Sequence, residues 1–276
     1  MGGALLGGLL KSGWAPAEQI AVVEPLPGRR EELARDFPGV QVVDIPRADL
    51  VGDRAGAVLA VKPDAAEGAC RVLGAVLGEV GAIRVLSIVA GVPCLRLETA
   101  LGGHPAVVRA MPNTPALVGA GVSAISGGSH VTSDDLAWAE SVMAAVGTVV
   151  RLPERLLDPV TGLSGSGPAY FFLVAEALME AGVQMGLTAE VSRTLVVETM
   201  LGSAKLLSAT GEDPAALRAM VTSPAARLRP GSARSNHGPC GRPSWRRWRQ
   251  PRNGHARLPY RVELDRLLPL RLRHPR

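Results

Sequence analysis

The sequence predicts an α/β protein in which a parallel sheet, wound through βαβ units, is followed by an all-helical region. Short apolar runs alternate with helical segments as far as residue 146. From residue 158 onward the alternation stops and only helical spacing remains. Strands alternating with helices are typical of a parallel sheet. A second change comes near residue 225, where the chain becomes rich in arginine and proline.

The elements of the first part follow one another along the chain. A helix is expected from Met1 to near Lys11, because its leucines recur at helical spacing and Gly13 follows them. Continuous apolar runs predict strands at residues 20–24, 40–43, 57–61, 85–89, 107–111 and 122–125. Helices are expected at residues 28–37 and 65–78, between these strands, and at residues 134–146, after the last of them.

Three helices are expected in the second part. Pro168 suits the first position of a helix that runs to near Met185, since that position needs no N–H donor. Thr188 is suited to cap a second helix that ends near Ser208, and Asp213 precedes a third. The first of these helices is apolar almost all round. So much apolar surface on so few helices predicts a partner chain.

The composition favours a cytoplasmic protein with a core of small aliphatic residues. Hydrophobic residues make up 47% of the 276 residues, but aromatic residues only 3%. The three cysteines form no CxxC pair, which indicates a reduced protein rather than a disulfide framework. Charged residues interrupt the apolar stretches, so neither a signal sequence nor a membrane span is expected. No metal site is expected.

The net charge of +5 averages two unlike parts. Residues 1–224 carry a net charge of −7. Residues 225–276 contain 14 arginines and no lysine, and carry +12. The two parts are therefore interpreted separately.

The first residues have features of a dinucleotide-binding loop. Gly2 and Gly3 open the first helix, and glycines at that position let a pyrophosphate approach a helix N-terminus. Glu24 ends an apolar strand about 20 residues later, where a carboxylate that binds a ribose 2′-hydroxyl is expected. Arg29 and Arg30 could instead bind a 2′-phosphate, so NAD and NADP both remain open. The alternative is an ordinary first helix rich in glycine and alanine.

Three further strand ends carry candidate cofactor residues. In open α/β sheets, ligands bind at the carboxyl ends of the strands. Small residues there would let a nicotinamide ring lie close to the backbone, and an asparagine could bond an amide or a ribose. Taken singly, each segment is also consistent with a plain turn. The candidates are Ala60, Val61, Lys62 and Pro63, then Ala90 and Gly91, then Asn113.

A fourth candidate segment precedes Pro168. It consists of Ser164, Gly165, Ser166 and Gly167. Backbone N–H groups and two hydroxyls converge there on a helix start, which suits a small carboxylate. An ordinary helix cap is the alternative.

Together these segments resemble the pyrroline-5-carboxylate reductases. The run from Gly162 to Tyr170 is highly specific to that family. The other matching segments occur in the family's order across residues 1–224. They are residues 1–2, 60–63, 90–92, 109–115, 119–122, 160–161, 186–187 and 221–224.

The resemblance implies a Rossmann-type NAD(P)-binding domain at residues 1–152 and a helical dimerisation and substrate domain at residues 153–224. It implies a homo-oligomer that transfers a hydride from NADPH, or less favourably NADH, to the C=N carbon of 1-pyrroline-5-carboxylate, giving L-proline. It gives the cofactor role to Gly2 and to the three strand ends above. It gives the substrate role to residues 164–167 together with Ser223 and Pro224.

Two departures from the family's pattern are visible. The family's chains begin several residues earlier, so the first strand of the Rossmann-type sheet is expected to be missing here. After Pro224 the family has a glycine-glycine-threonine loop, whereas this chain reads Ala225-Ala226-Arg227, so no catalytic residue is assigned. The remainder, residues 225–276, is expected to be a disordered tail outside the family's pattern. Its composition is typical of a GC-rich gene read in another frame.

Three other interpretations compete with an active reductase. The chain could be an inactive, frameshifted fragment of one. It could bind nucleic acid through the tail, where tryptophans alternate with arginines, although no specific nucleic-acid partner is expected. It could be another Rossmann-type reductase with a helical domain. Residues 160–170 argue against that last possibility, as does the lack of a lysine in the helix at 168–185.

Overall fold

The computed structural model describes residues 1–51, 56–80, 83–103 and 105–222. The chain divides into two units, Met1–Ala209 and Thr210–Arg276. The predicted tail at residues 225–276 lies outside the described ranges. Within those ranges, no helix combines the length and the apolar character needed to cross a membrane.

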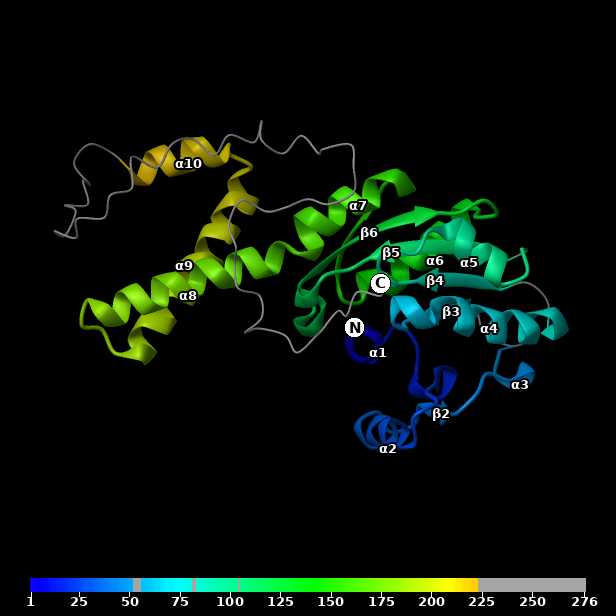
Figure 1. The fold of residues 1–276 in the computed structure, drawn as a ribbon. Coiled ribbons are helices and arrows are strands. Elements are labelled where there is room, and N and C mark those ends of the chain that lie inside the picture. The colour runs from blue at the N-terminus through cyan, green and yellow to red at the C-terminus, as the bar shows by residue number, and fades with distance from the viewer. Residues whose placement is uncertain (52–55, 81–82, 104, 223–276) are drawn as a thin grey trace, which may run out of the picture. The chain divides into compact units, whose positions relative to one another are not determined.

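The strands form two separate sheets (Figure 1). β1 (Ala21–Val23) pairs in parallel with β2 (Gln41–Val43). The larger sheet has the order β3-β4-β5-β6-β7, and its parallel members are β3 (Gly56–Leu59), β4 (Arg84–Ser87) and β5 (Val107–Met111). Among the described residues, the strands of the two sheets do not pair with each other.

The larger sheet is not parallel throughout. β6 (Gly121–Gly127) runs antiparallel to β5, and β7 (Gly147–Arg151) runs parallel to β6. The connection from β5 to β6 holds only η3 (Thr114–Val118), which is too short for the crossover that a parallel pair needs. The Rossmann-type α/β fold class is confirmed, but the expectation that this strand would join a parallel sheet is wrong.

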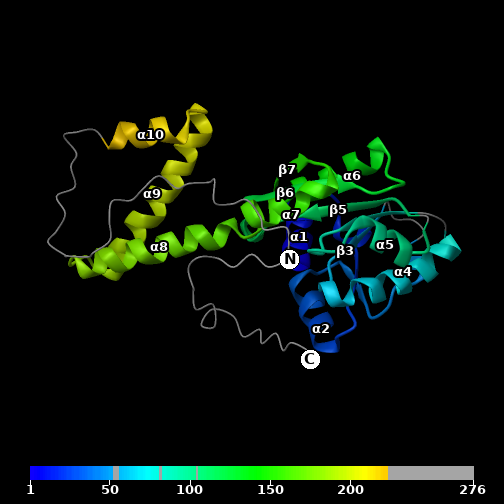
Figure 2. The same cartoon turned by 45° about the horizontal axis from the view of Figure 1, so that its top comes forward.

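Helices cover both faces of the larger sheet (Figure 2). Successive side chains of a strand point to opposite faces. Leu86 of β4 therefore packs with α1 (Gly2–Lys11) and α6 (Ser133–Ala144), whereas its neighbour Val85 packs with α4 (Ala66–Val80) and α5 (Cys94–Ala100). This explains why residues 85–89 are apolar apart from Ser87, since both faces of the sheet are buried here.

The small sheet has a core of its own. Leu6 of α1, Leu33 of α2 (Pro27–Asp36) and Val40 are buried together. The short helix α3 (Ala48–Val51) follows β2, and Val51 contributes to the core that contains Val85. Because α1 presents Leu6 to this core and Leu5 to the larger sheet, it joins the two sheets.

The helical region begins at residue 154, four residues before the position at which the alternation is seen to stop in the sequence. Its elements are η4 (Glu154–Leu156), α7 (Leu157–Val160), the π-helical turn η5 (Thr161–Gly165), α8 (Gly167–Gln184) and α9 (Ala189–Thr210), and the second unit contributes α10 (Pro214–Val221). The predicted cap at Thr188 is confirmed, since its hydroxyl accepts a hydrogen bond from Val191 N at 3.2 Å. Asp213, which the sequence predicts to precede a helix, accepts a hydrogen bond from Ala215 N at 2.7 Å.

Candidate functional site

The carboxyl ends of β3, β4 and β5 lie at one edge of the sheet, because these strands are parallel neighbours. Leu59 O, at the end of β3, accepts a hydrogen bond from Ile88 N, just past β4, at 3.0 Å. Asn113 follows the end of β5 by two residues. The structure thus brings the three predicted strand ends to the edge at which open α/β sheets bind ligands.

The first turn of α1 meets this edge. A Cβ atom at Gly2 would lie 3.1 Å from the Cβ of Ala60, so a larger side chain would crowd the strand end. The turn has no side-chain cap and no acidic residue. Its first N–H groups are therefore left for a ligand, and together with the helix dipole they suit an anion.

Glu24 and Arg30 hold the turn that follows β1. Glu24 Oε1 accepts a hydrogen bond from Leu26 N at 3.0 Å, where α2 begins. Arg30 donates to the carbonyl oxygens of Glu24 and Pro25 at 2.9 Å and 2.8 Å. Both side chains are thus bonded within the turn.

Arg29 has a different environment. It forms an ion pair with Glu32 at 2.5 Å on the exposed side of α2. Its Nη2 lies 3.6 Å from the position that a Cβ atom of Gly3 would occupy. Of the two arginines named from the sequence, Arg29 therefore lies beside the start of α1.

The remaining cofactor candidates lie on exposed loops at this edge. Val61, Lys62 and Pro63 are exposed, and Pro63 begins the single turn η2 (Pro63–Ala65). Ala90 and Gly91 are exposed directly after buried residues. Gly91 has φ +74°, a conformation that favours glycine.

Asn113 is buried and bonded on both sides. Its Oδ1 accepts a hydrogen bond from Val122 N at 2.9 Å, and its Nδ2 donates to the carbonyl oxygen of Ser164 at 3.2 Å. Asn113 therefore has two hydrogen-bond partners within the protein. Its contact with the cofactor stays a prediction from the sequence.

The predicted substrate segment lies against the end of β5. A Cβ atom at Gly165 would lie 2.8 Å from Met111 Cε. Ser164 Oγ donates to Val160 O at 3.2 Å, so this hydroxyl proton is used within the turn. Ser166 precedes α8, whose first turn has neither a side-chain cap nor an acidic residue. Ser223 and Pro224 lie outside the described residues.

Sequence reasoning missed a buried arginine near this segment. The Arg109 side chain on β5 is 5% exposed and pairs with Glu154 at 3.2 Å and with Asp158 at 3.7 Å. Glu154 also accepts a hydrogen bond from Cys94 N at 2.7 Å. These contacts fasten the start of the helical region to the sheet. Local sequence pattern offers no means of finding them, because the partners lie 45 or more positions apart.

The thiol beside this ion pair is not suited to nucleophilic chemistry. Burial, reinforced by the carboxylate of Glu154, raises the pKa of Cys94 to about 12. The thiolate is the reactive form of cysteine, and it is suppressed at neutral pH.

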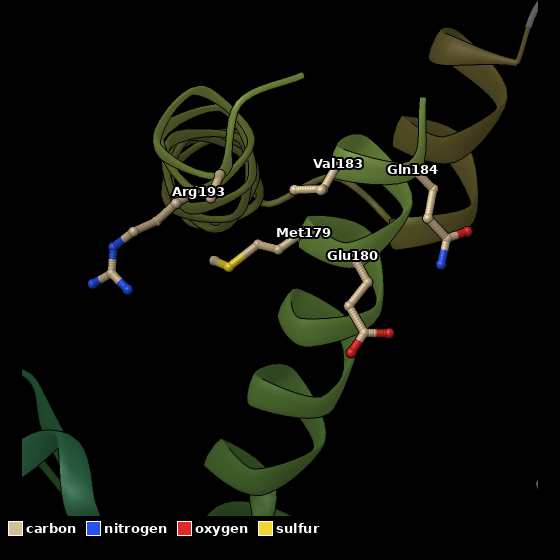
Figure 3. A pocket seen from close by; sticks show the side chains of 6 residues that line it. Met179, Glu180, Val183, Gln184 and Arg193 are labelled. Atoms are coloured by element: carbon tan, nitrogen blue, oxygen red, sulfur yellow. The ribbon is translucent and has the colours of Figure 1, made fainter. Parts of the chain in front are cut away.

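A hollow of about 450 Å³ lies away from the strand ends, between α8 and α9 (Figure 3). Met179 and Val183 of α8 point toward α9, and Arg193 of α9 lies on the opposite side of the hollow. The surrounding helix surfaces are apolar and exposed, including Phe171 and Phe172, each 66% exposed. The hollow therefore belongs to an uncovered helical surface rather than to the strand-end site.

Two family patterns match the chain, one in each part. Residues 1–90 match the family described as NADP oxidoreductase, coenzyme F420-dependent. Residues 154–227 match the family described as pyrroline-5-carboxylate reductase dimerisation. The first match covers α1 and the ends of β1 and β3, and the second covers the turn that contains Ser164.

Individual relatives agree with both matches. The pyrroline-5-carboxylate reductase of Synechocystis is 42% identical over 224 residues, covering 81% of this chain and 82% of its own. The solved structure of the Coxiella burnetii enzyme is 36% identical with a TM-score of 0.73, and 81% of this chain aligns with 82% of it. That of the Plasmodium falciparum enzyme, with NADP bound, is 28% identical with a TM-score of 0.71, over 82% and 81% of the two chains.

Proposed function

Because this chain belongs to the pyrroline-5-carboxylate reductase family, an NAD(P)H-dependent family that performs the last step of proline biosynthesis, we propose that it reduces 1-pyrroline-5-carboxylate to L-proline. The observation that carries the proposal is the hydrogen bond from Asn113 to Ser164. It joins the strand edge suited to the cofactor to the helix start suited to the substrate. We also propose the division at residues 1–152, 153–224 and 225–276, and a cytoplasmic location.

The strand edge fits a dinucleotide. The uncapped first turn of α1 would bind the pyrophosphate, and the close approach of Gly2 to Ala60 leaves no side chain in its way. The exposed loops at Lys62 and Gly91 would hold the ribose and the nicotinamide ring. When bound, NADPH supplies the hydride.

We propose that Arg29 binds the 2′-phosphate of NADPH. It is exposed beside Gly3, while Arg30 is bonded to backbone carbonyls. A guanidinium binds a phosphate through two parallel hydrogen bonds. Glu24, whose carboxylate accepts a hydrogen bond from Leu26 N, would then have one oxygen engaged in the turn rather than free for the adenosine ribose.

The helix start at Ser166 and Gly167 fits the substrate carboxylate. Pro168 lacks an N–H, but the neighbouring N–H groups at the start of α8 are free of side-chain caps, and the dipole of this helix favours a negative charge. For Ser223 and Pro224 the substrate role stays a prediction, because they lie outside the described residues.

The reduction requires little chemistry from side chains. The hydride adds to the C=N carbon, the ring nitrogen keeps or takes one proton from water, and NADP⁺ is released. The protein's part is to hold the two reactants in line and to exclude water. This agrees with the strand-end site, at which we assign no acid or base.

A direct assay of cofactor oxidation and product formation tests the proposed function. Purified full-length chain is mixed with NADPH and 1-pyrroline-5-carboxylate, the absorbance of NADPH is followed, and L-proline is quantified. We expect one L-proline for each NADPH oxidised. NADPH without substrate is the control, and substrate-independent oxidation or the absence of L-proline would contradict the proposal.

The uncovered surfaces of α8 and α9 support a homo-oligomer formed through these helices. Phe171, Phe172, Leu173 and Val174 are all at least half exposed within one turn. Patches of this kind on soluble proteins mark protein interfaces, and the family pattern at residues 154–227 is named for dimerisation.

A further inference from the structure

The backbone carbonyl of Ser164 cannot be satisfied within its own helix. An α-helix would pair it with the N–H four residues later, and that residue is Pro168, which has no N–H. The next donor, Ala169 N, bonds instead to Ser166 O at 3.0 Å. The Ser164 carbonyl receives its hydrogen from Asn113 Nδ2, 51 positions earlier in the chain.

The orientation of the Asn113 amide is fixed from its other side. Val122 N can only donate, so the atom of Asn113 that faces it at 2.9 Å must be the oxygen. The NH₂ group must then face Ser164. Val122 belongs to β6 and pairs with Thr148 of β7, so this end of the link is anchored in the sheet.

We infer that Asn113 is a positioning residue that sets the separation between the cofactor edge and the substrate turn, by supplying the donor that Pro168 lacks. This inference rests on the proposed function, because it assigns the two ends of the link to the two reactants. Hydride transfer needs the reacting atoms about 3–3.5 Å apart, and a misplacement of about 1 Å can lower a rate about 100-fold. A single side chain bonded to both parts therefore controls kcat.

The substitution Asn113→Asp tests the link. The carboxylate keeps an acceptor for Val122 N but sets an oxygen against the Ser164 carbonyl. At pH 8 we expect kcat to fall about 100-fold. At lower pH the introduced carboxyl group is protonated and donates to Ser164 again, so the ratio of variant to parent kcat should rise. A ratio independent of pH would overturn the inference, because the link predicts that protonation of the introduced carboxyl group restores the bond to Ser164.

Thr161→Val is the matched control. It removes a hydroxyl that donates to Leu157 O at 2.9 Å within the same turn, but it leaves the Asn113 bond intact. We expect kcat within about threefold of the parent and no new pH dependence. An equal loss in this variant would show that any disturbance of the turn lowers kcat, and would overturn the role of Asn113.

Hydrogen exchange separates this inference from the proposed function. If the parent chain gives no L-proline, the function fails, but the link is still measurable in the full-length protein. At one pH, Asn113→Asp should speed amide exchange in residues 160–168 about tenfold, and leave residues 142–146 in α6 and its end unchanged. Unchanged exchange in residues 160–168 would overturn the inference whatever the activity.

Discussion

At the scale of single residues, the missing side chains of glycines decide how closely backbones approach. Gly147 has φ +150°, and a Cβ atom there would fall on the carbonyl of Gly121 in the neighbouring strand. Gly68 in α4 is a contrasting case, with ordinary helical φ and no atom within 4 Å of the position that its Cβ would occupy. One glycine is therefore required by the pairing of β6 and β7, and the other is not.

The pair Gly147→Ala and Gly68→Ala tests this difference. We expect the first to lower the free energy of unfolding by about 2–4 kcal/mol, because the clash is with backbone that cannot move aside. The second should raise it by about 0.5–1 kcal/mol, because alanine favours a helix interior. Urea denaturation measures the free energy of unfolding of both variants. Equal changes in the two variants would contradict the different roles of Gly147 and Gly68.

Arg29→Ala tests the proposed choice of cofactor. Loss of a charge-assisted phosphate contact should raise the Kd for NADPH about tenfold or more and leave the Kd for NADH within about twofold. Arg35→Ala is the control, since Arg35 lies on the same helix and pairs with Asp36. If Arg29→Ala raised the Kd for NADPH and the Kd for NADH equally, Arg29 would contact a group that the two cofactors share rather than the 2′-phosphate.

At the scale of elements, α8 and α9 are helices whose apolar surface exceeds what one chain buries. Leu201 and Leu206 of α9 are 47% and 49% exposed, in addition to the two phenylalanines of α8. The sequence predicts this excess, since α8 is apolar almost all round. A helix hydrophobic on every side must be covered.

Phe172→Glu should dissociate the homo-oligomer. A charge within an apolar interface is desolvated without a partner, so association should weaken by about 2 kcal/mol or more. Sedimentation velocity measures the loss of the larger species. Leu95→Glu is the control, because Leu95 on α5 is 68% exposed, against 66% for Phe172, and lies outside the helical region. If Phe172→Glu left the fraction of the larger species unchanged, this part of α8 would lie outside the interface.

At the scale of the whole molecule, one core contains two thiols that burial keeps protonated. Burial, with a smaller contribution from Glu67, raises the pKa of Cys70 to about 11 from its ordinary value of 9.0. Burial and Glu154 raise that of Cys94 to about 12. Both residues contact the sheet face that holds Val85. The folded state therefore binds these two protons more tightly than the unfolded state.

The stability of the folded chain should consequently fall in alkali. The contribution of the two thiols is fully present below about pH 9 and is lost as the pH rises toward the folded values of about 11 and about 12. We expect the free energy of unfolding to drop by roughly 2 kcal/mol or more between pH 9 and pH 11. The double variant Cys70→Ala, Cys94→Ala should lose part of this slope, although it is less stable at every pH. If the free energy of unfolding fell equally with pH in the parent and in the double variant, the two thiols would not be the cause of the loss.

The sequence by itself determined the family, the α/β class, the change from alternating strands and helices to helices alone, and the cap at Thr188. These features are encoded locally, in the spacing of apolar residues and in the side chains that flank a helix. The same local evidence named the strand ends and the segment at Ser164 as site residues, and their roles remain predictions.

Only the tertiary structure decided the direction of β6, the different environments of Arg29 and Arg30, and the contacts of Arg109 and Asn113. Each depends on which backbone groups are brought together from distant parts of the chain. Pro168 shows in the sequence that one carbonyl lacks its helical donor. That the donor is Asn113 follows from the way β5, β6 and the π turn pack together, and no local pattern contains that information.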